Sequence, residues 1–220
     1  PIYITADKTR VEEARYSFEI DGGLPIDLTT PAEHIGAAEF KEIVWQSRPL
    51  GLSWLRRADG DLVLMLYDPQ EEVLGWAEVP IAGGHVESLA VTTSADGTRD
   101  VLTLVVKRQI NGQTVRMIEE QAVVYGAQFG DEPIHEANHL FASMIFEPAS
   151  ETNTFNVPHL IGEEVYAWTD QGQFGPLMVP SNGDVILDAP VTYAEIGLFD
   201  DTHLVDMFQP AIEEQEGDAR

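Results

Sequence analysis

The sequence contains no cysteine among its 220 residues. A disulfide framework and a thiolate metal site are therefore excluded, although the cellular compartment is not fixed by this absence. Long apolar runs are also missing: no stretch approaches the roughly 18 residues that suggest a membrane span, and the start lacks a signal-peptide pattern. No membrane span is expected. The first residue is Pro1 rather than Met, so we expect the chain to be a piece of a longer or processed protein.

Basic residues are scarce, above all in the second half. Lys and Arg number 12 against 38 Asp and Glu, which gives a formal net charge of −26. Residues 1–116 hold 11 basic and 18 acidic residues, whereas residues 117–219 hold 20 acidic residues and no basic one. Such a surface repels phosphate backbones and disfavours tight binding of nucleic acid. Two kinds of explanation stay open. The charge serves solubility or reflects a host that lives in salty water, or it forms a surface past which polyanions move without binding.

Signatures of catalysis are few. The sequence contains no G-x-S-x-G elbow, no P-loop and no G-x-G-x-x-G fingerprint, and with 38 acidic residues a glycosidase pair cannot be singled out. Four isolated histidines are interpreted as structural or exposed. They are His34, His85, His159 and His203. We therefore predict a protein that is not an enzyme and that has no catalytic, cofactor-binding or metal-binding residues.

One motif favours the opposite interpretation. The segment HEANH matches H-E-x-x-H, in which two histidines on one helix face bind zinc and the glutamate acts as general base. The residues concerned are His135, Glu136 and His139, with Glu163 or Glu164 as a third ligand. Because prolines flank the segment and no long helix is predicted there, we favour a solvated connector. A zinc metallopeptidase remains an alternative.

Turn signals between apolar segments predict an all-β fold. Asp59-Gly60 and Asn111-Gly112 each separate two apolar segments, as in tight hairpins. Two units emerge, residues 51–79 and 86–124, each with about three antiparallel strands, a pattern that suits propeller blades or a sandwich. We predict antiparallel propeller-like blades within a domain of residues 1–125.

The rest of the chain divides into smaller parts. A short helix is predicted over residues 31–39, with Thr30 and Glu33 forming a capping box around Pro31. Three parts follow the first domain: an acidic connector over residues 126–160 with a strand near 142–146, a smaller antiparallel β module over 161–205, and a disordered acidic tail over 206–220.

Two tryptophans and one pair of adjacent arginines in the first domain are interpreted as structural residues. Trp54 and Trp76 are expected in the core rather than on a sugar-binding surface. Arg56 and Arg57 are adjacent on one predicted strand, so their side chains should point to opposite faces.

Two segments resemble the tail nozzle proteins of short-tailed bacteriophages, also called tail tubular protein B or tail stabilisation protein. The segments are WLRRADGDLVLMLYDPQEEVLGWAEVPIAGGHVESLAV and DVLTLVVKRQINGQTVRMIEE. The matching positions are Trp54, Asp59, Gly60, Leu62, Tyr67, Val73, Trp76, Gly84, Val86, Ser88, Arg108, Gly112, Ile118 and Glu119. Upstream, DLTTPAEHI and Val44-Trp45-Gln46 look like the family's short helix and following strand. Downstream, VPHLIGEEVYAWTDQG, GDVILDAP and AEIGLFDDTHL look like its later segments.

The resemblance implies a structural virion component without enzymatic activity. Nozzle proteins form rings, usually hexamers, below the portal and adaptor proteins, line the channel through which DNA leaves, and carry tail fibres or spikes on their sides. Members of the family are usually much longer than this chain. A β-sheet module that binds sugar or another protein is a third possibility.

Overall fold

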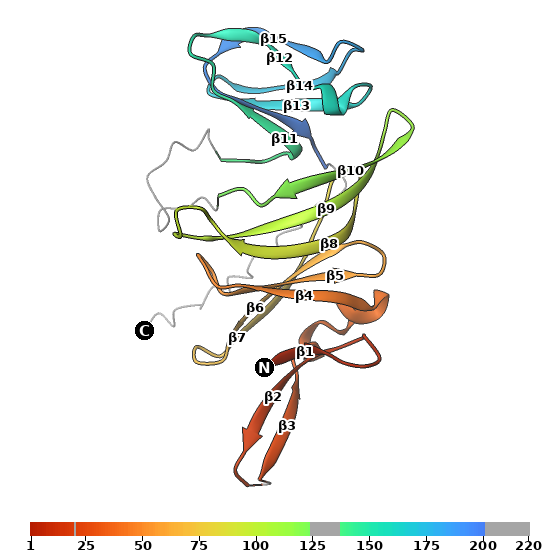
Figure 1. Ribbon diagram of the computed structural model, residues 1–220, viewed down its shortest axis with the longest axis vertical. Coiled ribbons are helices and arrows are strands. Elements are labelled where there is room, and N and C mark those ends of the chain that lie inside the picture. Colours follow the sequence, from red (N-terminus) through yellow and green to blue (C-terminus); the bar gives the residue numbers. More distant parts are fainter. Residues whose placement is uncertain (20, 124–136, 201–220) are drawn as a thin grey trace, which may run out of the picture.

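The computed structural model describes residues 1–19, 21–123 and 137–200. These residues form antiparallel β-sheets with two short 3-10 helices, so the predicted all-β fold is confirmed. Figure 1 shows the sheets stacked one after another along the long axis, from the N-terminal hairpin to the C-terminal module.

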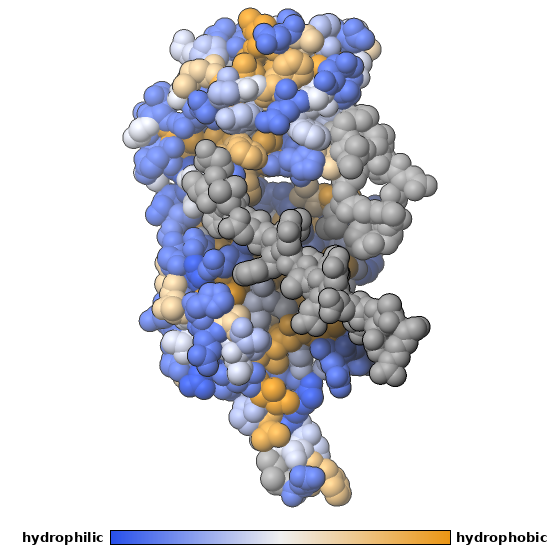
Figure 2. All heavy atoms as spheres, turned by 180° about the vertical axis from the view of Figure 1, so that it is seen from behind, coloured by the Kyte–Doolittle hydropathy of each residue, from blue (hydrophilic) through white to orange (hydrophobic). Residues whose placement is uncertain are grey.

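The N-terminal sheet has three strands, β1 (Ile2–Ile4), β2 (Val11–Ser17) and β3 (Gly22–Asp27), in the order β1-β2-β3. The hairpin of β2 and β3 projects from the body (Figure 1). Gly22 and Gly23 form the start of β3. Phe18, next to the turn, is 88% exposed. Seen from behind, hydrophobic residues form a band that begins at this hairpin and continues over the neighbouring sheet (Figure 2).

The predicted short helix is present as the 3-10 helix η1 (Thr30–Ala38), but the predicted capping box is wrong. Thr30 lies inside the helix, and the N-cap is Thr29, whose side chain makes no capping hydrogen bond to the helix. The reason is Asp27: its Oδ1 accepts hydrogen bonds from the Thr29 backbone N–H at 2.8 Å and the Thr29 hydroxyl at 2.5 Å. An Asx turn thus sets the entry to the helix.

A four-stranded meander follows, with β4 (Phe40–Gln46), β5 (Leu52–Arg57), β6 (Leu62–Asp68) and β7 (Val73–Val79). Its two faces contribute to different cores, because successive side chains of a strand alternate. Leu55 packs with η1 and the N-terminal sheet, and Trp54 packs against the next sheet. The same alternation separates Arg56, which pairs with Glu42, from Arg57, which pairs with Glu78. The prediction of opposite faces is confirmed.

The next sheet consists of β8 (Gly84–Thr93), β9 (Asp100–Ile110) and β10 (Gln113–Glu120) in the order β10-β9-β8. Its apolar face packs on the meander through a shared core. The buried members of that core are Leu52, Trp54, Leu62, Val86, Leu89, Leu102, Leu104 and Val106. The two predicted units therefore correspond to two packed sheets, of which the first begins earlier, at Phe40.

The C-terminal module contains two sheets. One has the order β11-β16-β13-β14 and the other pairs β12 with β15. The bounds are β11 (Phe141–Phe146), β12 (Thr152–Asn156), η3 (Pro158–Leu160), β13 (Glu164–Thr169), β14 (Gly172–Met178), β15 (Asp184–Val191) and β16 (Ala194–Leu198). β11 and β12 lie within the predicted connector but pair with strands of the module. The predicted disordered tail lies outside the described residues.

The module rests on the tip of the β9–β10 hairpin. Ile110 is buried in the module's core, and Val115 and Met117 pack against the same core. The Asn111 backbone N–H donates a 2.7 Å hydrogen bond to Glu163 Oε1. The hairpin therefore joins the central sheets to the module.

Gly60 occupies a position where a side chain would be costly. Its φ is +90°, and a Cβ would lie 2.2 Å from His85 Nδ1, whereas Gly97 has φ +72° and open space around it. Gly97→Ala should lower the free energy of unfolding by about 1–2 kcal/mol, through backbone strain alone. Gly60→Ala should cost about 2–4 kcal/mol, because strain is joined by displacement of the His85 ring. Urea unfolding of both variants measures the difference, and equal costs would contradict the predicted steric contribution.

Candidate functional site

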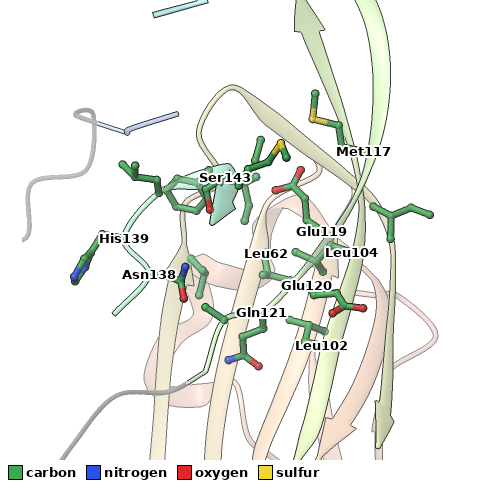
Figure 3. Close-up of a pocket in the computed structure, with 18 of the residues that line it drawn as sticks. Leu62, Leu102, Leu104, Met117, Glu119, Glu120, Gln121, Asn138, His139 and Ser143 are labelled. Carbon is green, nitrogen blue, oxygen red and sulfur yellow. The ribbon is translucent and has the colours of Figure 1, made fainter. Parts of the chain in front are cut away.

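A cleft of about 880 Å³ lies where the two central sheets and the C-terminal module meet. Two continuous runs of residues line it, 117–123 and 138–145, and the side chains of Trp54, Leu62 and Leu104 contribute apolar surface. In Figure 3 the residues of the first run lie opposite Asn138, His139 and Ser143 of the second. The volume falls within the roughly 300–1,000 Å³ typical of ligand pockets.

A buried ion pair fixes one side of this cleft. Arg108 on β9 is 1% exposed, and its guanidinium forms a bidentate pair with Glu119 on β10. The Arg108 Nε also donates to the Ala82 carbonyl oxygen at 3.0 Å. Arg108 thus links β10 to the turn before β8, and the Glu119 carboxylate, which lines the cleft, is engaged by a full positive charge.

A second polar group, centred on Gln46, connects the sheets at the cleft. Gln46 is 1% exposed, and its Nε2 donates to the Asp100 carbonyl oxygen at 2.8 Å and to Gln121 Oε1 at 2.7 Å. Its Oε1 accepts from Trp54 Nε1 at 2.8 Å. These bonds satisfy the buried amide and the buried indole, as burial of polar groups requires. They also hold the end of β10 against the meander.

Asp100 extends the same connection. Its Oδ2 accepts hydrogen bonds from the backbone N–H groups of Ser47 at 2.9 Å and Arg48 at 3.0 Å, and its Oδ1 accepts from the Thr93 hydroxyl. Burial acts to raise the pKa of Asp100, but the bonds from Arg48, Ser47 and Thr93 favour the charged form and leave the pKa below its usual value. The carboxylate therefore joins the β4–β5 loop to β9.

Three of the polar side chains that line the cleft are used to join strands or segments. Glu119 is occupied by Arg108, Gln121 by Gln46, and Ser143 by Glu195. General acid–base catalysis needs a titratable group within hydrogen-bond reach of a substrate. Beside these engaged groups the cleft offers apolar side chains and strand edges, which suit binding, and the titratable side chains of Glu120 and His139.

The structure places the residues of the H-E-x-x-H motif only in part. His135 and Glu136 lie outside the described residues. His139 is in an irregular segment, its backbone N–H donates to Glu195 Oε2 at 2.7 Å, and its ring meets the Trp168 ring edge-on at 4.7 Å between centroids. Among residues 1–19, 21–123 and 137–200, no three His, Asp or Glu side chains form a group that could hold a metal ion.

Several structural interpretations from the sequence are confirmed. Trp54 is buried, and Trp76 is half-buried with its Nε1 donating to the Leu28 carbonyl oxygen at 2.9 Å. His159 makes a 2.7 Å hydrogen bond with the Ala142 carbonyl oxygen, which fits a structural role. His203 lies outside the described residues.

Glu195 is the site residue that sequence reasoning misses. It is fully buried on β16, and it accepts hydrogen bonds from the backbone N–H groups of His139 and Leu140 and from the Ser143 hydroxyl. It thereby fixes the segment that forms one side of the cleft. The available signal was an acidic residue inside the apolar strand AEIGL, where an unpaired charge would be costly.

The charge of the C-terminal module is of one sign. Residues 137–200 include nine acidic residues and no Lys or Arg. Four of these acidic side chains are exposed and lie on different elements: Glu147, Glu151, Glu164 and Asp188. The module therefore presents carboxylates without basic side chains of its own.

Comparison with protein-family models finds no match for the chain, and comparison with curated proteins finds none either. The resemblance to tail nozzle proteins thus rests on the ordered motifs of the sequence. Within the described ranges, no helix has the length and apolar character needed to cross a membrane.

Proposed function

We propose that this chain is a structural subunit of the tail nozzle of a short-tailed bacteriophage. It would assemble with further copies of itself into a ring, in the manner of the family's usual hexamers, below the portal and adaptor proteins of the virion. DNA would pass through the ring without tight binding, and tail fibres or spikes would dock on its outer side. The proposal includes no enzymatic step and no cofactor.

The proposal is carried by one observation: the residues on which the resemblance rests make contacts between strands and sheets. Arg108 pairs with Glu119, and Trp54 donates to Gln46. Gly60 gives space to the His85 ring. These residues hold strands and sheets together, which is what a load-resisting ring component needs. A catalytic site would keep such groups available to a substrate.

The distribution of charge supports the passage of DNA. Each Lys or Arg contact to phosphate adds affinity through counterion release. The 103 residues from 117 to 219 contain none of these side chains. A channel lined by this part of the chain would repel the phosphate backbone and leave DNA free to slide.

Sedimentation velocity tests both halves of the proposal in one experiment. The chain is sedimented with a fluorescent DNA duplex at an ionic strength of about 0.01 M, where the Debye length is about 30 Å and electrostatic effects are strongest. We expect the protein to sediment as a ring-sized oligomer and the duplex to sediment as free DNA. A matched variant, E147K/E151K/E164K/D188K, should bind the duplex more tightly than the natural chain.

Two results would count against the proposal. Protein that remains monomeric at all concentrations contradicts ring formation. A duplex that sediments with the natural protein, and is released by added salt, contradicts the role of the acidic surface.

A further inference from the structure

Two strands present their edges, rather than their faces, to the cleft. A strand that contributes one face to a cavity lines it with every second residue, because side chains alternate. Here the lining residues are consecutive, 117–123 at the end of β10 and 138–145 at β11. Both strands are the outermost strands of their sheets in the part of the chain that the structure describes.

The register of β10 shows which of its backbone groups point into the cleft. The turn at Asn111-Gly112 has two residues with positive φ, and Ile110 pairs with Gln113 beside it. Hydrogen-bonded and non-hydrogen-bonded pairs then alternate along the hairpin. The Gln121 N–H donates to the Leu102 carbonyl oxygen at 2.8 Å, which agrees with that alternation.

It follows that Ile118 and Glu120 belong to non-hydrogen-bonded pairs, opposite Val105 and Thr103. Their N–H and C=O groups point away from β9, toward the open edge. No strand among the described residues pairs with this edge. An edge of this kind is a template for another strand.

We propose that the cleft binds an extended segment of a partner protein, which pairs with the free edge of β10 and lies beside β11. Main-chain hydrogen bonds to Ile118 and Glu120 provide the affinity, and the cleft accepts alternate side chains of the segment. Arg108 and Glu195 keep the two edges in place before the segment arrives, which reduces the entropic cost of binding.

The chemistry of the cleft defines the segment. Its inward side chains would be apolar, because they meet Leu62, Leu102 and Leu104. Its other side chains would be Lys or Arg, because Glu120 lines the cleft, Arg99 is the single Lys or Arg among the residues that line it, and residues 117–199 contain neither. The inference does not depend on the nozzle proposal, since it rests on a strand edge that is unpaired among the described residues and on the cleft beside it.

Fluorescence anisotropy with defined peptides tests the site. The probe is a labelled, end-blocked peptide of about ten residues that alternates valine and lysine. We expect saturable binding to the whole chain. A peptide with two central prolines should bind at least about tenfold more weakly because it loses main-chain donors, and one with glutamate for lysine should also bind at least about tenfold more weakly.

The matched protein variants are Ile118→Pro and Ile118→Val. Ile118 is 78% exposed and its N–H points outward, so proline removes one donor to the partner without breaking the β9–β10 ladder. I118P should weaken binding about tenfold, and I118V, which keeps the donor, should bind as the natural chain does. Hydrogen exchange supplies an independent readout, because the amides of Ile118 and Glu120 should become protected when the valine–lysine peptide binds.

The outcomes separate clearly. Absence of binding up to about 1 mM peptide overturns the site. Equal binding of the proline-containing peptide, or equal effects of I118P and I118V, overturns strand pairing. Equal binding of the glutamate peptide overturns the charge preference. None of these results depends on whether the chain forms rings or excludes DNA, so failure here and failure of the proposed function can be told apart.

Discussion

Replacing Glu119 with alanine is expected to lower the free energy of unfolding by about 3–5 kcal/mol. The Arg108 side chain is fully buried, and Glu119 is its bidentate anionic partner. In E119A the guanidinium would keep only its bond to the Ala82 carbonyl oxygen among the bonds described above. The free-energy cost of a buried charge without a counter-ion is far larger than the net stabilisation that the intact pair provides. A loss of this size is a large part of the about 5–15 kcal/mol that stabilises a typical domain.

Urea unfolding followed by circular dichroism measures this loss, with Glu120→Ala as the control. Glu120 is the exposed neighbour on the same strand, and its removal should change stability by no more than about 0.5 kcal/mol. The double variant R108M/E119L should recover most of the loss, because apolar groups of similar size can replace a buried ion pair. If E119A costs less than about 1 kcal/mol, Arg108 does not depend on Glu119 and the cleft edge is held in another way.

The parts of the fold that the sequence predicts well are those whose signals are local. Asp59-Gly60 and Asn111-Gly112 specify tight turns, and the structure has hairpins at both. The alternation of Trp54 and Leu55 between two cores follows from strand geometry alone. These features need no knowledge of how the sheets pack together.

The two strands that lie in the predicted connector have interrupted patterns. β11 and β12 contain register shifts between Phe141 and Met144 and between Thr152 and Thr154. A bulge inserts a residue and breaks the period of two. The sequence therefore predicts only the strand near 142–146, which is β11, and misses β12. The hairpin of β2 and β3 is missed for another reason: the residues of both strands are exposed or half-buried apart from Val11, and the apolar alternation that marks a half-buried strand does not arise.

The cleft could not have been predicted from the sequence, because it is made of residues that only the packing of sheets brings together. Leu62 on the meander, Gln121 after β10 and Ser143 on β11 line the same space. Glu195, which holds the β11 side, lies 52 residues after Ser143 in the chain. Motif searches find functional residues that lie at a fixed, short separation in the sequence. Among the described residues, this site contains no such motif.

Replacing Asp100 with alanine should lower the free energy of unfolding at neutral pH by about 2–4 kcal/mol, since a donor left without its acceptor costs about 1–3 kcal/mol and the two donors here are only partly buried. The backbone N–H groups of Ser47 and Arg48 both donate to this carboxylate, and D100A leaves them without that acceptor. Asp100→Asn keeps the shape and one acceptor oxygen without the charge, so it should cost about half as much.

The same carboxylate should give the natural chain a pH dependence that D100N lacks. The pKa of Asp100 in the folded protein lies below the 3.8 of an unperturbed aspartate. A lowered pKa means that the stabilisation is fully present above the unfolded-state pKa, and that it is lost as the pH falls through the folded-state value. The stability difference between the natural chain and D100N should therefore stay constant from about pH 7 to about pH 5 and shrink below about pH 4.

Urea unfolding of the two proteins at matched pH values measures this difference directly. Subtracting one curve from the other removes the contribution of the remaining carboxylates, which the two proteins share and which titrate in the same range. The loop that Asp100 holds leads from β4 into β5, and Gln46 at its start also reaches Gln121 at the cleft. If the difference were unchanged at about pH 3, or grew as the pH fell, the charged form of Asp100 would not be what joins β9 to this loop.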